Sequence, residues 1–287
     1  MNYRFLSVVV TLACIFCGGG CHTDSKPSVK SGEIRVVSLS PNYTEIIFAL
    51  GAEGALVGRT DACNYPPECK LTPVVGSYAS PNWEKIFTVM PTTILTADFS
   101  DDRAEKILLD RGIEVYRNDP RTFDDLFEAI RQTGKRVEKE AEAAQLTDAL
   151  QAELNVIQAA SANRADKPRV LVVVWHNPLC VVGGNTFVAQ AVRIAGGVNL
   201  SDDLKQRYVN ISPEKVVQYA PDVILFPQME AGVSADALLS YPGLESVPAI
   251  KNKRIITEIP GDIILRPGPR LIQGVKALAE ILSGISN

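Results

Sequence analysis

Few side chains in this sequence have the types and spacing that catalysis needs. Histidine is the usual general acid or base near neutral pH, and the chain has only His22 and His176. It contains no Gly-x-Ser-x-Gly, no Walker loop and no Gly-x-Gly-x-x-Gly, and Gly183-Gly184-Asn185 is an isolated glycine-rich turn. We therefore expect a protein that is not an enzyme.

A site that captures a bare transition-metal ion is also not expected. Such sites group two or three histidines with carboxylates, and His176 is the only histidine beyond the polar N-terminal segment. His176 ends the apolar run 170–175, where a hydrogen-bonded rim residue is commoner than a ligand. We expect no metal site and no resident cofactor.

Three of the six cysteines lie beyond residue 21: Cys63, Cys69 and Cys180. In an oxidising compartment Cys63 and Cys69 could close a small loop around residues 65–67. Sequence alone does not show whether their Cα atoms approach closely enough, so a disulfide and two free thiols both remain open.

Asp262 and Arg266 are four residues apart, so on a helix they share one face. Two interpretations are open. They form a surface ion pair that contributes little to stability, or they are polar residues of a binding site.

The N-terminus predicts export. Arg4 precedes the apolar run 5–17, and three glycines then lead to Cys21, the order of regions in a signal peptide. The glycines and Cys21 resemble a lipobox, with Cys14 as a weaker alternative for acylation. We expect a signal peptide at 1–20, a flexible tether at 21–33, and a lipoprotein of the periplasm or cell envelope. The lipid would be its only attachment to the membrane, because no apolar stretch reaches the ~18 residues of a spanning helix.

Composition predicts a packed protein that does not bind nucleic acid. The chain has 287 residues, of which 46% are hydrophobic and 22% charged, enough for two medium domains. Its net charge is −4, and without basic runs it offers nothing to attract phosphate backbones. We expect a monomer.

An internal repeat divides the chain. Residues 84–95 and 214–225 are identical at five of twelve positions, and each predicts a short helix, a turn at proline and a buried strand. In both halves an apolar β-branched run, beginning at Arg35 and at Arg169, also precedes a helix that ends near glycine. The pattern predicts two similarly built α/β lobes, 34–120 and 161–287, each with a mostly parallel sheet.

Residues 121–160 separate the lobes and contain a single glycine, Gly134, and no proline. Apolar residues recur in them every three to four positions, and Thr122 can cap the first turn. If continuous, this helix would extend over about 55–60 Å. One stiff helical connection predicts little hinge closure between the lobes.

Three segments resemble a known family. They are the Ser-Pro-x-x-Thr-Glu motif at 40–45, the Tyr-Pro-Pro loop at 65–67, and the ending Asp262-x3-Arg266-x2-Pro269-Arg270. The chain resembles, from about residue 33 to 285, the substrate-binding proteins of ABC importers for vitamin B12 and ferric siderophores, most closely the vitamin B12-binding members. The resemblance implies two Rossmann-like lobes joined by one long helix, with a ligand cleft between them. It also implies an ABC permease dimer, with its cytoplasmic ATPase, as partner.

The resemblance also implies the site residues. Tyr78 and Tyr208 fall where the vitamin B12 binders have indoles, and Cys180 falls where they have phenylalanine. Asp262 and Arg266 would bind the amide-rich rim of a corrinoid, and Ser40, Pro41 and Asn42 would present backbone N–H groups to the cleft. The expected cargo is a corrinoid such as cobalamin; the alternative is a ferric siderophore or haem.

Glu84 and Glu214 occupy equivalent positions of the repeat. A carboxylate in a first helical turn is stabilised by the helix dipole, which would explain each glutamate separately. The family resemblance implies a different role, in which one glutamate per lobe meets arginines on each half of a two-fold symmetric permease.

Overall fold

The computed structural model describes residues 32–98, 102–164, 166–227 and 236–285. Contacts divide the chain into two units, residues 1–33 and 34–287, and the fold described below is that of the second. The expected signal peptide and Cys21 lie outside the described residues. No helix in the described ranges combines the length and apolar character needed to cross a bilayer.

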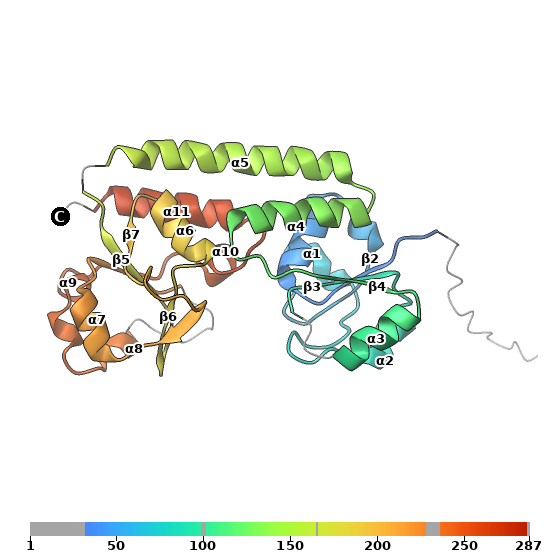
Figure 1. Ribbon diagram of the computed structural model, residues 1–287, viewed down its shortest axis with the longest axis horizontal. Coiled ribbons are helices and arrows are strands. Elements are labelled where there is room, and N and C mark those ends of the chain that lie inside the picture. The colour runs from blue at the N-terminus through green and yellow to red at the C-terminus, as the bar shows by residue number, and fades with distance from the viewer. Residues whose placement is uncertain (1–31, 99–101, 165, 228–235, 286–287) are drawn as a thin grey trace, which may run out of the picture. The chain divides into compact units, whose positions relative to one another are not determined.

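The first half of this unit is built on a four-stranded parallel sheet of order β2-β1-β3-β4. Its central strand β1 is buried on both faces, as the apolar run Val36-Val37 requires. The strands are β1 (Val36–Ser38), β2 (Leu56–Arg59), β3 (Thr93–Thr96) and β4 (Glu114–Arg117). Its helices are α1 (Pro41–Ala49), α2 (Trp83–Thr88) and α3 (Asp102–Asp110), with short 3-10 turns at Glu53–Ala55 and Pro67–Leu71 (Figure 1).

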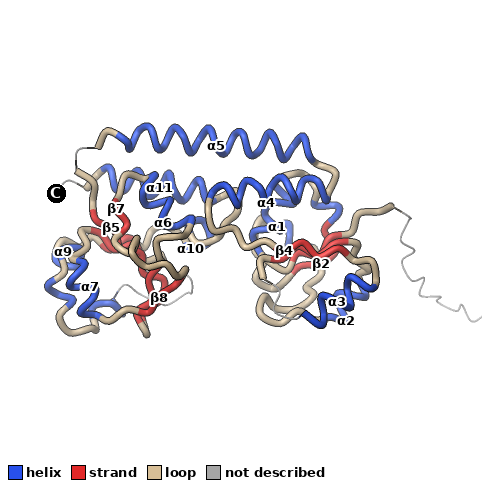
Figure 2. Tube along the Cα trace, in the orientation of Figure 1, coloured by secondary structure: helices blue, strands red, loops and turns tan. Residues whose placement is uncertain are grey.

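The second half has a six-stranded mixed sheet of order β10-β9-β5-β6-β8, with β7 paired to β5 (Figure 2). Its strands are β5 (Arg169–His176), β6 (Leu179–Val182), β7 (Val198–Asn199), β8 (Tyr208–Asn210), β9 (Val223–Leu225) and β10 (Ile255–Ile256). The helices are α6 (Phe187–Ile194), α7 (Pro213–Tyr219), α8 (Asp236–Leu239), α9 (Pro248–Lys251), α10 (Gly261–Ile264) and α11 (Leu271–Ser283), with a 3-10 turn at Leu244–Ser246.

This second sheet is less parallel than the sequence predicts. β6 runs antiparallel to β5, and β8 runs antiparallel to β6. His176 pairs with Leu179 across the two residues Asn177 and Pro178, and so short a loop can join only antiparallel strands. The apolar run that begins at Arg169 therefore leads into a hairpin before it reaches α6.

The predicted repeat is confirmed. α2 leads to β3 and α7 leads to β9, and the caps match: the Asn82 and Ser212 side chains accept hydrogen bonds from the backbone N–H of Lys85 and Lys215. Each helix is followed by a residue with positive φ directly before a proline, Met90 at 45° and Ala220 at 42°. The same helix–proline–strand unit is thus built twice.

The single helix expected over 121–160 is wrong. The segment forms α4 (Phe123–Arg136) and α5 (Glu140–Ala162), separated by Glu138, whose φ is +54°. The N–H of Lys139 donates to Gly134 O at 2.7 Å, the closing bond of a Schellman motif. Gly134 permits the turn, because a Cβ there would lie 2.4 Å from Ala143 Cβ. α5 alone spans the two halves and is about 35 Å long.

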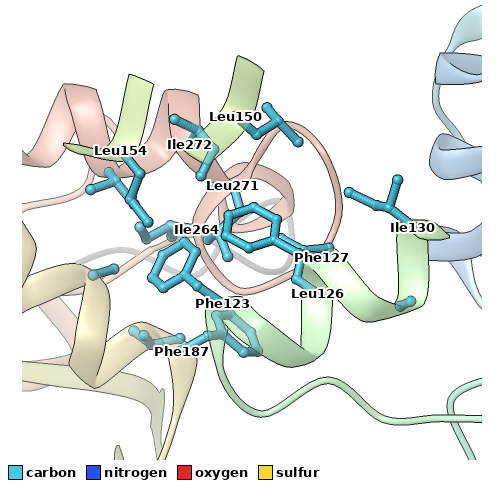
Figure 3. Packing of buried hydrophobic residues seen from close by; sticks show 14 of the residues in the cluster. Phe123, Leu126, Phe127, Ile130, Leu150, Leu154, Phe187, Ile264, Leu271 and Ile272 are labelled. Carbon is cyan, nitrogen blue, oxygen red and sulfur yellow. The ribbon is translucent and has the colours of Figure 1, made fainter. Parts of the chain in front are cut away.

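The two halves share one hydrophobic core. Side chains of α4 meet those of α5, α6 and α11 in a single buried cluster that also includes the inner faces of both sheets (Figure 3). Separate smaller clusters cover the outer face of each sheet. Figure 3 labels Phe123, Leu126, Phe127, Ile130, Leu150, Leu154, Phe187, Ile264, Leu271 and Ile272 of the shared cluster. Opening the two halves would expose this core, and limited hinge motion stays a prediction.

The close approach at Gly134 gives the first testable prediction. Gly134→Ala places a methyl group against Ala143 and the Lys139 carbonyl, so we expect urea unfolding to show a loss of about 1–3 kcal/mol through overpacking. Gly54→Ala is the matched control, because nothing lies within 4 Å of a Cβ there, and its effect should stay within about 0.5 kcal/mol. A rise in stability of Gly134→Ala would show that helix propensity outweighs the contact.

Candidate functional site

The carboxyl ends of the four strands of the first sheet all lead to one cavity. In parallel α/β sheets, ligands bind outside this edge of the sheet. Each strand is followed within six residues by a segment that lines a cavity of about 490 Å³. These lining residues are Pro41 and Asn42 after β1, Ala62 after β2, Ala97 and Asp98 after β3, and Asp119 after β4.

The opposite wall comes from the second half of the unit. Arg207 and Tyr208 lie at the start of β8, and the other residues come from α10 and the turn after it. They are Gly261, Asp262, Leu265, Arg266 and Pro267. The cavity therefore lies between the two lobes, where the family resemblance implies a ligand cleft.

Tyr78 and Tyr208 both line the cavity, and their exposed fractions of 52% and 46% are high for aromatic residues. Neither side chain is buried by the protein, so both retain surface that a ligand could contact. Burial is the main cause that raises the pKa of Tyr78; Asp119 raises it further, whereas Arg207 and a hydrogen bond with Ser40 act to lower it. The Tyr78 phenol therefore stays protonated at neutral pH.

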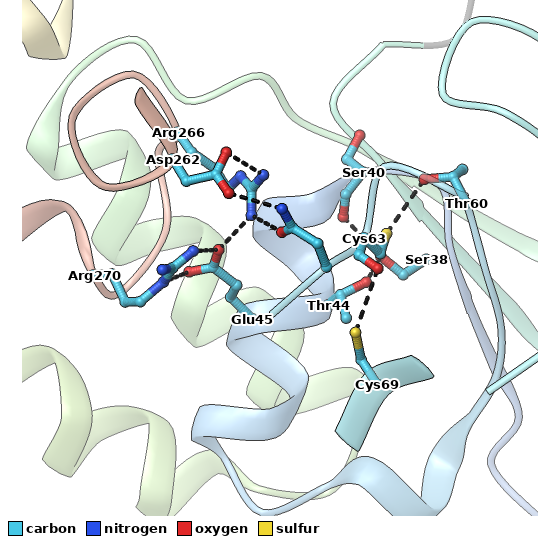
Figure 4. Close-up of polar contacts among 11 residues, drawn as sticks. Ser38, Ser40, Thr44, Glu45, Thr60, Cys63, Cys69, Asp262, Arg266 and Arg270 are labelled. Atoms are coloured by element: carbon cyan, nitrogen blue, oxygen red, sulfur yellow. Dashed lines mark hydrogen bonds and ion pairs between the residues drawn. The ribbon is translucent and has the colours of Figure 1, made fainter. Parts of the chain in front are cut away.

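A buried carboxylate, Glu45, joins the two cavity walls. It lies on α1, its side chain is 2% exposed, and it accepts hydrogen bonds from two arginines of the second half. Arg270 donates through Nε and Nη2 at 2.9 and 2.6 Å, and Arg266 through Nη1 at 2.7 Å (Figure 4). Burial opposes the charge on Arg270, but its bonds to Glu45 raise the Arg270 pKa.

Asp262 and Arg266 belong to this network. Arg266 Nη2 donates to Asp262 Oδ1 at 2.8 Å, and Asn64 bridges the pair by accepting from Arg266 and donating to Asp262. Of the two open interpretations, a simple surface pair is therefore wrong. Asp262 and Arg266 lie on the cavity wall and are tied to α1 through Glu45.

The loop after β2 carries Asn64 and Tyr65 and is held from beneath by Arg59. The guanidinium of Arg59 is buried and donates to the carbonyls of Cys69, Thr60 and Cys63 at 2.7–3.0 Å. This fixes the loop so that Tyr65 lies over Arg270, with the guanidinium carbon 3.7 Å from the ring centroid.

Cys63 and Cys69 are free thiols in the structure. Cys69 Sγ donates to Cys63 O at 3.4 Å, and Cys63 Sγ contacts Thr60 Oγ1 at 3.3 Å (Figure 4). Burial raises the pKa of the Cys69 thiol despite the opposing charge of nearby Arg59. The structure thus favours the thiol alternative over the disulfide.

Three residues singled out in the sequence lie away from the cavity wall. Ser40 is buried, and its hydroxyl accepts a hydrogen bond from Ala97 N at 2.9 Å. It thus positions Ala97, which lines the cavity. Cys180 is half-buried in β6 and does not line the cavity. The carbonyl of His176 accepts from the Tyr241 hydroxyl at 2.7 Å. The described residues include no cluster of three His, Cys, Asp or Glu suited to a metal ion.

Sequence reasoning did not single out Asp119 and Arg207, which form an ion pair across the cavity. Burial acts against the charge on Arg207, but the hydrogen bond with Asp119 raises its pKa. A usable signal existed for Asp119, because it lies two residues after a strand of a parallel sheet. For Arg207, the only signal in the sequence was its position next to Tyr208.

Glu84 and Glu214 are exposed at the second residue after the caps of α2 and α7, one in each half. A hydrogen bond from Ser212 and another from the backbone lower the pKa of Glu214. The two glutamates therefore share a helical position as well as a sequence pattern, away from the cavity wall.

Comparison with known proteins places this geometry in context. Residues 36–259 match the family described as periplasmic binding protein. The chain is 31% identical to the uncharacterized ABC transporter substrate-binding lipoprotein YvrC of Bacillus subtilis, over 88% of this chain and 81% of that protein. It is 26% identical to the vitamin B12-binding protein of Vibrio vulnificus, over 88% and 90%. The periplasmic heme-binding protein RhuT of Roseiflexus superposes with a TM-score of 0.79 at 29% identity, over 88% and 99%.

The Glu45 network predicts a large effect of one substitution on stability. Glu45→Gln keeps the side-chain shape but leaves Arg266 and Arg270 without a buried counter-charge, so we expect a loss of about 3 kcal/mol in urea unfolding. Asp262→Asn is the control, since Asp262 is the exposed partner of the same network, and its cost should stay below about 1 kcal/mol. Equal losses in the two variants would contradict the assigned role of Glu45.

Proposed function

From the premise that the chain belongs to the periplasmic binding protein family, we propose that its cargo is a corrinoid. Its role is that of an exported substrate-binding component of an ABC transporter. In this proposal the protein captures cobalamin or a related corrinoid outside the cytoplasmic membrane. It then delivers the corrinoid to a permease dimer that is driven by a cytoplasmic ATPase.

One observation carries the corrinoid proposal: two half-exposed tyrosine rings, Tyr78 and Tyr208, line a cavity between the lobes. Aromatic faces can cover a flat macrocycle from both sides and provide most of its apolar contact area. The 26% identity to a vitamin B12-binding protein over 88% of the chain supports the same cargo.

The rim of the cavity fits a ligand with many amides. Asp262 can accept hydrogen bonds, the Arg266 guanidinium can donate them, and both residues line the cavity. A corrin ring carries amide side chains around its edge, and amides both donate and accept. The Glu45 network holds Asp262 and Arg266 in place before the ligand arrives, which reduces the cost of ordering them on binding.

Haem is the second candidate, and Tyr78 is the observation that favours it. A phenol can be an axial ligand of haem iron, Tyr78 lines the cavity, and the similar structure of RhuT is that of a haem-binding protein. The raised pKa of Tyr78 opposes the phenolate that would coordinate iron. Corrinoid binding needs only the ring face, so we keep it as the first proposal, with a ferric siderophore as a further alternative.

We propose that the protein is anchored through a lipid on Cys21, which becomes the first residue after removal of the signal peptide. The relative from Bacillus subtilis is named a lipoprotein. The polar segment between Cys21 and the folded unit would then act as the tether that lets the cavity sample the space outside the membrane.

We propose that Glu84 and Glu214 dock the protein on the permease. Each is exposed at the same position of a matched helix, one per lobe. Two equivalent carboxylates suit a partner with two-fold symmetry, and complementary charge would steer the encounter.

Calorimetric titration with cyanocobalamin tests the corrinoid proposal. Wild type should bind one equivalent, and Tyr78→Ala with Tyr208→Ala should weaken binding ~100-fold, because two aromatic faces together contribute about 3 kcal/mol. Tyr78→Phe with Tyr208→Phe keeps both faces and should bind nearly as tightly as wild type. Unchanged affinity of the alanine variant would show that the cavity is not the corrinoid site.

The same phenylalanine variant separates the two cargoes. If wild type gives no heat with cyanocobalamin but binds haem with a spectrum of tyrosine-ligated iron, and the phenylalanine variant loses that spectrum, the corrinoid proposal is replaced by haem. Ferric hydroxamates complete the panel of ligands.

The docking proposal predicts that Glu84→Arg with Glu214→Arg abolishes ligand uptake in cells and binding to the purified permease. Ligand affinity and melting temperature should remain near wild type, because both side chains are exposed. Glu153→Arg with Glu280→Arg is the matched control: it makes the same charge change at exposed positions of α5 and α11, and it should transport normally. Wild-type uptake by the first variant would assign both glutamates to helix capping alone.

A further inference from the structure

Asp119 and Arg207 connect the two lobes at the cavity surface. They are 88 residues apart in sequence, and Arg207 Nη1 donates to Asp119 Oδ2. Both residues line the cavity, and their side chains are 30% and 22% exposed. Unlike Glu45 and its arginines, this pair is therefore in contact with solvent in the space that a ligand would occupy.

Contacts besides the ion pair with Asp119 also hold Arg207. Its backbone carbonyl accepts a hydrogen bond from Gly183 N at 2.9 Å. A Cβ on Gly183 would lie 1.9 Å from Gln206 O, so the backbone at Gly183 is in close contact with the backbone that precedes Arg207. The guanidinium carbon lies 5.4 Å from the Tyr208 ring centroid and 5.9 Å from that of buried Phe187. Two aromatic rings and the backbone thus hold the cation in place.

Arg207 is also the cavity-lining arginine that can change partners at low cost. Arg266 is committed to Glu45, Asn64 and Asp262, so removing it from these groups would break three hydrogen bonds and weaken the link between the lobes. Arg207 has a single carboxylate partner among the described residues, and that partner belongs to the loop after β4. A partly solvated pair exchanges one carboxylate for another anion with a small net change in charge interactions.

We propose that Arg207 is the anion receptor of the cavity, and that Asp119 occupies it until an anionic group of the ligand takes its place. The inference rests on the proposed function and adds to it the chemistry that the site selects. A guanidinium pairs with carboxylate and phosphate through the same planar donor geometry. The selected group is thus an oxyanion: the phosphodiester of a complete corrinoid or a propionate of haem.

The proposal predicts opposite effects for the two members of the pair. Asp119→Asn removes the internal competitor and should tighten binding of cyanocobalamin ~3–10-fold. Arg207→Gln removes the receptor and should weaken binding ~10-fold or more, with Arg207→Lys in between because it cannot form the planar pair. Calorimetry measures each affinity, and thermal unfolding verifies that every variant is folded.

Analogues that lack the oxyanion show whether the site recognises that group. Dicyanocobinamide lacks the phosphodiester of cyanocobalamin, and haem dimethyl ester lacks the free carboxylates of haem. For these two probes, Asp119→Asn and Arg207→Gln should each change affinity less than ~2-fold. If the substitutions change the affinity for cyanocobalamin but not for dicyanocobinamide, the anion is the phosphodiester. If they change the affinity for haem but not for its dimethyl ester, the anion is a propionate.

Asp98→Asn is the matched control, because it removes the same formal charge from a residue that lines the same cavity. It should tighten binding less than Asp119→Asn does. Equal tightening by the two variants would show that the effect comes from the loss of any negative charge in the cavity, and it would overturn the proposal. Weaker or unchanged binding of cyanocobalamin and haem by Asp119→Asn would also overturn it.

Failure of the inference is distinguishable from failure of the proposed function. If wild type binds a corrinoid or haem but the Asp119 and Arg207 variants change affinity equally for probes with and without a free oxyanion, the anion receptor alone is wrong. If wild type binds none of the four probes, the proposed cargo is wrong and the inference falls with it.

Discussion

A carboxylate that is 2% exposed needs positive charge beside it, and for Glu45 that charge comes from the other lobe. Because Arg266 and Arg270 approach α1 from the segment between α10 and α11, the ion pairs form only when the two lobes are correctly placed. Such buried networks contribute less to net stability than their bond count suggests. Their value here is geometric: the same contacts that satisfy Glu45 fix the walls of the cavity.

The shared hydrophobic core imposes the same restriction by other means. α4 and α11 contribute to a cluster that includes the inner faces of both sheets, and α5 packs across it (Figures 1 and 3). The lobes are therefore joined by an apolar layer on one side and by the Glu45 network near the cavity. In the proposed function, a protein built this way would recognise its ligand mainly through side chains that are already in position, such as Tyr78, and through local partner exchange, such as that proposed for Arg207.

Sequence patterns predicted well those features that depend on neighbouring residues. The α2–β3 and α7–β9 units follow from apolar periodicity, capping residues and prolines, all of which act within about ten positions. The break between α4 and α5 was missed because Glu138 adopts a left-handed conformation that glycine usually marks. The β5–β6 hairpin was missed because a buried strand in a mixed sheet has the same composition as one in a parallel sheet.

The site was predictable only where a motif marks it. Tyr78, Tyr208, Asp262 and Arg266 were identified through the family resemblance, and the structure brings all four to one cavity. Glu45 was recognised as part of a motif, but its two arginine partners lie more than two hundred residues away. No local pattern encodes a contact of that range, and the same is true of Asp119 with Arg207.

The distance in sequence between Glu45 and its arginines also bears on the order of folding. Arg266 and Arg270 follow Glu45 by 221 and 225 residues, so at ordinary rates of synthesis they are made about 10–45 s later. Throughout that interval Glu45 lacks its counter-charges, and burying its ionised carboxylate would cost free energy. Complete packing of α1 is therefore disfavoured while the chain is still being made. For a chain that crosses a membrane unfolded, as the proposed signal peptide would require, such a delay favours translocation.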